Sequence, residues 1–150
     1  MTHFCRIIDV TDADGRVAEP AWLDRAEPVH RQLRTTLPAD YAGRLAQVFA
    51  NGGRLAVAAE GEAVLGVALW RLIENTCEGR RLYVDDLVSD ATRRSRGVGK
   101  ALLGHLESKA RGLGCDVLAL DSGAQRAAAH KFYFREGMHI PGFCFRKNLK

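Results

Sequence analysis

The residues best suited to bind a ligand gather between positions 82 and 100. A stretch of apolar and acidic residues, 82–90, is followed by four basic residues and two glycines, namely Arg93, Arg94, Arg96, Gly97, Gly99 and Lys100. A helix that begins here would carry unpaired backbone N–H groups and a partial positive charge at its first turn. Glycines at that turn have no side chain to block the close approach of a phosphate. The spacing therefore predicts a pyrophosphate site where a strand passes into a helix.

Two common nucleotide motifs do not fit this loop. A P-loop would end in Gly-Lys-Ser or Gly-Lys-Thr, and a dinucleotide-binding fingerprint would have a third glycine. The remaining alternative is a solvated basic turn that binds nothing. Glycine spacing, charge and the position between strand and helix agree with a binding loop, so we favour the ligand site.

Three further side chains could move protons. Asp85 and Asp86 are neighbours in the predicted strand, so strand alternation directs them to opposite faces and at most one faces a substrate directly. Either carboxylate could accept a proton, directly or through a water, with Asp86 preferred, and an ion pair with Arg80 or Arg81 is an equally good interpretation. Tyr133 lies in an amphipathic stretch, where it could pack in the core or offer its hydroxyl.

Composition limits the class of protein. The chain has 150 residues, of which 47% are hydrophobic, and a net charge of +4, which suits one domain over residues 1–150. It shows no apolar run of about 18 residues and no leader-like start, so we expect a soluble, cytoplasmic protein without a membrane partner. Outside the loop the basic residues are scattered, which argues against nucleic acid. The four cysteines stand singly, without metal-binding or redox spacing, and we expect no metal.

The hydrophobic pattern predicts the elements that precede the loop. Residues 17–37 have helical spacing that Pro20 and Pro28 interrupt, and a second helix covers 38–49. Alternating and β-branched stretches predict strands instead. These strands are 3–10, 54–60, 63–73 and 80–88, and the last three form an antiparallel meander.

Beyond the loop the pattern indicates a strand, helix, strand unit. The apolar stripe of 98–113 predicts a helix, and the wholly apolar run 117–120 predicts a parallel strand covered on both faces. A capping-box pattern at 122–125 opens another helix, and a last strand, 143–149, has an edge that a second copy could cover in a homodimer. The chain is thus expected to have an α/β (α+β) fold with a mixed sheet of six or seven strands and helices on both faces.

The segment 82–100 resembles motif A of the GNAT superfamily of acetyl-CoA-dependent N-acetyltransferases. Its signature, Gln/Arg-x-x-Gly-x-Gly/Ala, is met by residues 94–99, which follow a Val-Asp-Asp-Leu-Val strand. The block 129–138 is similar to the family's Ala-x-x-Phe-Tyr-x-x-x-Gly-Phe helix, with Met138 where phenylalanine is usual. Ser122 and Gly123 also replace an asparagine common before this helix. The resemblance extends from about residue 54 to the end of the chain.

This resemblance implies roles for the matching residues. Acetyl-CoA would be the co-substrate, its pantetheine arm paired with the backbone of β-strand residues and its pyrophosphate held by the loop. The sheet would splay between its fourth and fifth strands to admit it. The Tyr133 hydroxyl would protonate the departing thiolate. The implied cofactor-binding residues are Leu87, Val88, Arg93, Arg94, Ser95, Arg96, Gly97, Val98, Gly99 and Lys100.

The implied reaction is direct attack of a primary amine on the acetyl group. Because lysine-like amines have a pKa of about 10.4, a proton must leave before attack, and Asp86 or Asp85 would receive it. The end of the chain is distantly similar to aminoalkylphosphonate acetyltransferases, which favours a small-molecule acceptor. The alternatives are a protein or peptide lysine as acceptor, and a noncatalytic acyl-CoA sensor.

Overall fold

The computed structural model describes residues 5–93 and 97–150. Its chain forms two compact units, one ending at Ala119 and one running from Leu120 to Lys150, and each is described by itself. Predictions for residues 3 and 4, and for Arg94, Ser95 and Arg96, lie outside the described residues. In chain order the elements are β1 (Arg6–Asp9), α1 (Pro20–Leu33), α2 (Tyr41–Ala50), β2 (Arg54–Glu60), β3 (Ala63–Asn75), β4 (Gly79–Ser89), a 3-10 helix (Ala91–Arg93), α3 (Val98–Gly112), β5 (Val117–Leu120) and α4 (Ala127–Arg135).

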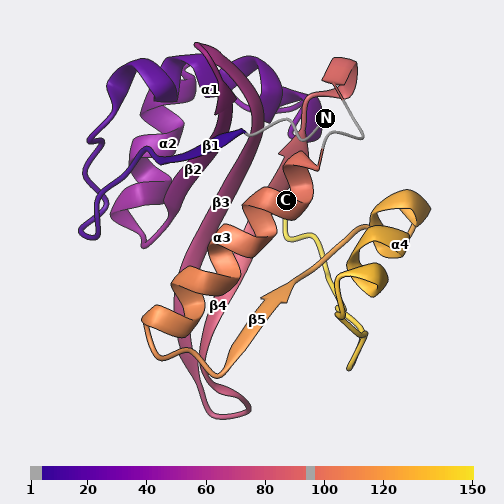
Figure 1. Cartoon of the computed structure of the whole chain (residues 1–150). Coiled ribbons are helices and arrows are strands. Elements are labelled where there is room, and N and C mark those ends of the chain that lie inside the picture. The colour runs from indigo at the N-terminus through magenta and orange to yellow at the C-terminus, as the bar shows by residue number, and fades with distance from the viewer. Residues whose placement is uncertain (1–4, 94–96) are drawn as a thin grey trace. The chain divides into compact units, whose positions relative to one another are not determined.

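Among the described residues, five strands form one mixed sheet in the order β1-β2-β3-β4-β5 (Figure 1). The first four are antiparallel, which confirms the predicted meander, whereas β5 follows α3 and runs parallel to β4. Just before β5, the N–H of Asp116 donates to the carbonyl of Arg80 over 2.6 Å.

The prediction of six or seven strands is wrong. Residues 138–150 contain no strand, and the apolar side chains of the expected last strand, Phe143, Phe145 and Leu149, are 86%, 94% and 90% exposed. An alternating apolar segment becomes a strand only when its backbone pairs with a sheet edge. Among the described residues, 143–149 make no such backbone hydrogen bonds.

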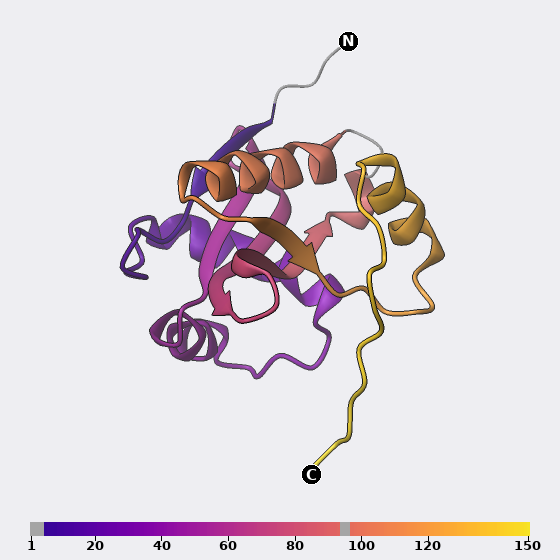
Figure 2. The same ribbon diagram turned by 90° about the horizontal axis from the view of Figure 1, so that it is seen from below.

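Helices cover both faces of the sheet in the first unit, as predicted. On one face α1 and α2 share a core with β2 and β3, while α3 covers the other face (Figure 2). Gly66 of β3 allows α3 to approach closely, because a Cβ there would lie 2.6 Å from Val98 Cγ1 and 2.9 Å from Leu102 Cδ1.

In the described ranges, no helix has the length and apolar character needed to cross a membrane.

Capping and proline chemistry set the helix boundaries. The region expected to be interrupted by prolines is one helix, since Pro20 occupies its first turn and Pro28 is accommodated within it. Asp40 Oδ1 accepts the N–H of Gly43 over 2.9 Å and so opens α2. The capping box predicted at 122–125 does not form. A turn in which Arg126 N–H bonds the Gly123 carbonyl comes first, and α4 begins only at residue 127 without a side-chain cap.

Candidate active site

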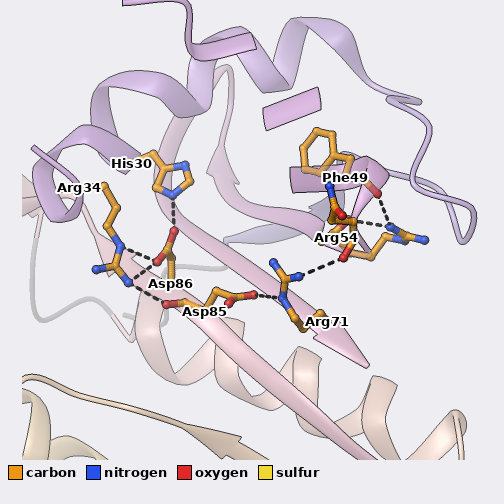
Figure 3. A network of polar contacts seen from close by, with 9 residues as sticks. His30, Arg34, Phe49, Arg54, Arg71, Asp85 and Asp86 are labelled. Carbon is orange, nitrogen blue, oxygen red and sulfur yellow. Dashed lines mark hydrogen bonds and ion pairs between the residues drawn. The ribbon is translucent and has the colours of Figure 1, made fainter. Parts of the chain in front are cut away.

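A β-bulge interrupts β4 at its two neighbouring carboxylates. Leu69 of β3 pairs with Asp86, whereas the next residue, Trp70, pairs with Val84, so Asp85 is the extra residue. A bulge breaks the regular alternation of side chains along a strand. Asp86 bonds His30 of α1. Asp85 bonds Arg71, which itself bonds the carbonyl of Asn51 at the end of α2, so both carboxylates lie on the side of the sheet that α1 and α2 cover (Figure 3). The expectation that they point to opposite faces is wrong for this reason.

Asp86 accepts hydrogen bonds from His30 of α1 and from Arg34, the residue that caps the end of α1. His30 Nε2 donates to Oδ2 over 2.7 Å, and Arg34 Nε donates to Oδ1 over 2.6 Å. The side chain of Asp86 is 8% exposed and that of Arg34 is 50% exposed. Burial works to raise the pKa of Asp86, but the hydrogen bonds and charges of His30 and Arg34 outweigh it and hold the pKa below its usual value. Asp86 is therefore ionised at neutral pH.

His30 connects Asp86 to the first residue of α2. Its Nδ1 lies 2.8 Å from the hydroxyl oxygen of Tyr41, and the two rings meet edge to face with centroids 5.6 Å apart. His30 and Tyr41 are 1% and 3% exposed. Burial, followed by the nearby negative charges, raises the pKa of Tyr41, so its hydroxyl keeps its proton. A buried polar chain thus joins α1, α2 and β4.

Asp85 is held by an arginine from β3. Arg71 Nε donates to Asp85 Oδ2 over 2.7 Å, and Arg71 Nη1 donates to the carbonyl of Asn51, which ends α2, over 3.1 Å. Arg34 Nη2 donates to the backbone carbonyl of Asp85 over 2.9 Å. Two guanidinium groups therefore fix the bulge against α1 and α2.

The arginines that the sequence suggested as carboxylate partners are engaged elsewhere. Arg80 Nε bonds Glu74 over 2.7 Å, and Arg81 Nη1 bonds Glu78 over 3.5 Å. Both stand near the start of β4, at its hairpin with β3. The suggested ion pair of Asp85 or Asp86 with these residues is therefore wrong.

A cavity of about 510 Å³ opens beside Asp86. Its walls come from the end of α1, the segment that joins α1 to α2, one side of α2 and the middle of β3 and β4. The lining residues are His30, Arg34, Thr36, Leu37, Pro38, Arg44, Leu45, Gln47, Val48, Leu69 and Asp86. One buried anion and two arginines thus share a space with apolar walls.

The start of α3 has the backbone expected of an anion site. Gly97 is its N-cap residue and has φ 74° and ψ 15°, a left-handed conformation that favours glycine. Val98, Gly99 and Lys100 form the first turn, which contains no acidic residue. Unpaired N–H groups in that turn point away from the helix body. Arg93, the first basic residue of the predicted loop, is the last residue of the 3-10 helix.

A glutamine that sequence reasoning missed holds the turn before this loop. Gln32 of α1 accepts the N–H of Ala91 over 2.9 Å and donates to Asp90 over 3.2 Å. Asp90 also accepts the N–H of Thr92 over 3.1 Å, and its own N–H donates to the Leu65 carbonyl over 2.8 Å. The end of β4 is therefore anchored to α1 and β3.

Tyr133 lies on α4, in the second unit. Its ring centroid is 5.4 Å from that of Phe132, and burial raises the pKa of Tyr133 although the positive charge of Arg126 opposes the shift. The hydroxyl therefore stays protonated at neutral pH. The structure brings Asp85 and Asp86 together with α1, whereas it places Tyr133 in the other unit.

Similarity to known proteins decides the family. The model of the acetyltransferase (GNAT) family matches residues 17–138, which is most of the chain. The chain belongs to the GNAT family. The resemblance predicted from residues 82–100 and 129–138 is thereby confirmed.

Individual relatives of this GNAT chain match over shorter stretches. An uncharacterized N-acetyltransferase, YhdJ of Bacillus subtilis (strain 168), is 42% identical over 71 residues, which cover 47% of this chain and 50% of YhdJ. The aminoalkylphosphonate N-acetyltransferase of Salmonella typhimurium is 35% identical over 66 residues, which cover 44% and 43% of the two chains. The chain thus spans about half the length of the curated relatives it matches.

The GNAT fold is also seen in a solved structure of AAC(6')-Iy in complex with the bisubstrate analog CoA-S-monomethyl-acetylneamine. The TM-score is 0.80 with 99% of each chain covered, and the sequence identity is 15%. At that identity the likeness shows the fold alone.

Metal and thiol chemistry are not prominent in the described part of this GNAT chain. The cysteines are free, with Cys77 and Cys144 exposed. Across residues 5–93 and 97–150, no group of three or more His, Cys, Asp and Glu side chains could hold a metal ion. The polar chemistry of the first unit therefore centres on the β4 carboxylates and the start of α3.

Proposed function

We propose that this GNAT chain transfers the acetyl group of acetyl-CoA to the primary amine of a small molecule that enters the cavity beside Asp86. The carrying observation is a buried, ionised carboxylate in the wall of that cavity. An ammonium group is attracted to such a carboxylate more strongly than in water, because the surroundings screen charge less. The volume of about 510 Å³ lies inside the range of roughly 300 to 1,000 Å³ that is usual for small-ligand sites.

Acetyl-CoA fits the segment between the end of β4 and the start of α3. Gly97 has a left-handed conformation and the first turn of α3 has no acidic residue, which suits the binding of a pyrophosphate. Lys100 and the loop arginines are proposed to add positive charge to this site. Acetyl-CoA supplies an activated thioester. The residues proposed to hold it are those of the sequence prediction, namely Leu87, Val88, Arg93, Arg94, Ser95, Arg96, Gly97, Val98, Gly99 and Lys100.

Asp86 is proposed to hold the amine and to stabilise the positive charge that its nitrogen gains during attack. The lowered pKa of Asp86 makes this carboxylate a weak base, so it holds the proton released by the amine only briefly, and the proton then passes through a neighbouring water to bulk solvent. Asp85 is less suited to this role because Arg71 engages its carboxylate. Asp86 is therefore the main catalytic candidate on β4.

Tyr133 is proposed as the general acid. The leaving thiolate requires a proton, and a tyrosine hydroxyl whose pKa is raised by burial is protonated at neutral pH and ready to donate. The family resemblance of the helix 129–138 supports this role.

The acceptor is proposed to carry an acidic group in addition to its amine. Among the described residues, the guanidinium of Arg44 has one hydrogen-bond acceptor, Gln47 Oε1 at 3.1 Å, and no carboxylate partner. Asp86 is already balanced by Arg34, so the cavity keeps a net positive charge. An arginine with spare N–H groups suits a carboxylate or phosphonate. The relative named as an aminoalkylphosphonate N-acetyltransferase is consistent with this class.

Titration with acetyl-CoA, joined to a thiol-release assay, tests the proposal. The assay panel contains neutral amines, amino acids, aminoalkylphosphonates and lysine peptides. Turnover of small amines with an acidic group is the expected result. Preferential turnover of lysine peptides would make the chain a protein acetyltransferase, and binding of acetyl-CoA without any turnover would make it a sensor. Absence of binding would contradict the acetyl-transfer proposal itself.

A further inference from the structure

A buried polar chain leads from Asp86 to two residues, His30 and Tyr41, to which the reaction proposed above gives no part. The hydroxyl of Tyr41, the ring of His30 and the carboxylate of Asp86 follow one another at 2.8 Å and 2.7 Å. Their exposed fractions are 3%, 1% and 7%. Since buried polar groups are costly unless paired, a chain built from α2, α1 and β4 requires an explanation.

The hydrogen-bond network assigns the protons in this chain. Asp86 is ionised and can only accept, so the proton between it and His30 must sit on Nε2. Tyr41 keeps its own hydroxyl proton, which lies within hydrogen-bond distance of His30 Nδ1. Each donor then has an acceptor, and the imidazole ring is held at both nitrogens.

The carboxylate of Asp86 retains capacity for one more donor. An ionised carboxylate offers about four lone-pair positions. Arg34 occupies those of Oδ1 with Nε and Nη2, and His30 occupies one of Oδ2. The unused position belongs to Oδ2, the oxygen whose orientation His30 controls.

We propose that His30 and Tyr41 are positioning residues for the acceptor amine, which fix the Asp86 carboxylate in the cavity wall with one Oδ2 position open to the ammonium group. This inference rests on the proposed acetyl transfer. His30 acts through Asp86, and Tyr41 acts through His30. Neither residue needs to touch the substrate.

The neighbouring charges determine the pH dependence that follows. The charged and titratable groups around Asp86 are His30 of α1, Arg34 at the cap of α1, Tyr41 and the cavity residue Arg44 of α2, and Asp85 along β4. Asp85 is neutralised by Arg71 of β3. Removing the His30 hydrogen bond leaves the burial of Asp86 less opposed, so the pKa of Asp86 rises. The acid limb of the acceptor kcat/KM should then move to higher pH.

Four variants separate positioning from a purely structural role. His30→Leu removes both bonds, His30→Gln offers an amide N–H in place of Nε2–H, and Tyr41→Phe removes the hydroxyl alone. The matched control is His105→Leu, because His105 Nε2 also bonds an aspartate, Asp9 Oδ1 at 3.1 Å, but on α3 and away from the cavity. For each variant we would measure acceptor KM, kcat, the pH profile of kcat/KM and the Kd for acetyl-CoA.

We expect His30→Leu to lower acceptor kcat/KM by about 10- to 100-fold, mainly through KM, as the loss of a hydrogen bond to a charged group predicts. Tyr41→Phe should lower it by about 2- to 10-fold, the range for a neutral hydrogen bond. Both should move the acid limb upward and leave the acetyl-CoA Kd unchanged. His30→Gln should recover most of the loss, and His105→Leu should match the wild type.

An unchanged acceptor KM and acid limb in Tyr41→Phe and His30→Leu, with wild-type turnover intact, would overturn this inference while leaving acetyl transfer standing. A parallel fall in kcat and in acetyl-CoA binding sites would do the same, since it reports lost folded protein. If His30→Leu does not fold, Tyr41→Phe and His30→Gln still decide. No turnover in the wild type would overturn acetyl transfer and this inference together.

Discussion

Arg34 Nε donates to Asp86 Oδ1 over 2.6 Å, although half of the arginine side chain is exposed and the carboxylate is almost entirely buried. The ion pair therefore joins a half-exposed arginine to a buried carboxylate in the cavity wall. It keeps a buried carboxylate ionised, which burial alone would oppose. A charged anchor for an amine is available only while this arrangement persists.

Arg34→Ala should shift the pH dependence of activity. Without Arg34 one cause of the lowered pKa of Asp86 is gone, so the pKa rises and the carboxylate is protonated at higher pH. Activity that needs ionised Asp86 is present above this pKa and lost as pH falls through it. The acid limb of kcat/KM for the acceptor should therefore move upward. Arg25→Ala, within the helix that Arg34 caps, is the control, because Arg25 pairs with Glu62 outside the cavity. An equal shift of the acid limb in Arg34→Ala and Arg25→Ala would contradict a specific effect of Arg34 on Asp86.

Arg44→Ala should change acceptor preference. Because Arg44 has no carboxylate partner among the described residues, its positive charge is available to an acidic acceptor. We expect KM to rise by roughly 10-fold or more for amines with a carboxylate or phosphonate, the loss of a charge-assisted bond. Neutral amines should change little. Equal effects on both classes, measured by steady-state kinetics, would contradict an anion-binding role.

Gly97→Ala should weaken acetyl-CoA binding. A Cβ at Gly97 would meet no atom of the described residues within 4 Å, so the cost expected from them comes from the left-handed φ of 74° and not from a clash. A residue with a Cβ pays about 1 to 2 kcal/mol in that conformation. The alanine variant should therefore either change the backbone at the start of α3 or lower the free energy of unfolding. Gly104→Ala is the matched control, since it is equally unobstructed but lies inside α3. It should raise stability, as alanine does in helix interiors. Thermal unfolding, which measures stability, and calorimetric titration with acetyl-CoA, which measures affinity, would distinguish Gly97→Ala from the Gly104→Ala control.

Tyr133→Phe should slow the chemical step. Loss of a general acid typically lowers the rate by about 10²- to 10⁴-fold. The ring and its contact with Phe132 remain, so the Kd for acetyl-CoA should be nearly unchanged. Stopped-flow measurement of thiol release, with binding measured separately, tests this. A variant with normal turnover would exclude Tyr133 as the acid.

Local sequence chemistry predicted much of the scaffold. The meander, α3 and the strand after it follow from apolar periodicity, and the family match confirms the resemblance to the GNAT family. The last strand was wrong because strand formation depends on an edge to pair with, which alternation within 143–149 does not report.

The site was harder to predict because its contacts join residues far apart in the chain. His30 and Asp86 are separated by 56 positions, and a bulge at Asp85 changed the facing of the carboxylates. Neither feature has a local pattern. The one available signal was a histidine among the apolar residues of α1, such as Ala26 and Val29, because a polar group on a buried helix face needs a partner.

The central claim is that Asp86 anchors the acceptor amine, and the most direct measurement is acceptor kcat/KM for Asp86→Asn. Asparagine keeps the shape but loses the charge, so kcat/KM should fall by about 10- to 100-fold, the loss of a charge-assisted hydrogen bond. Acetyl-CoA affinity should be unchanged, and Asp85→Asn should have the smaller effect. Wild-type kcat/KM in Asp86→Asn would contradict the account.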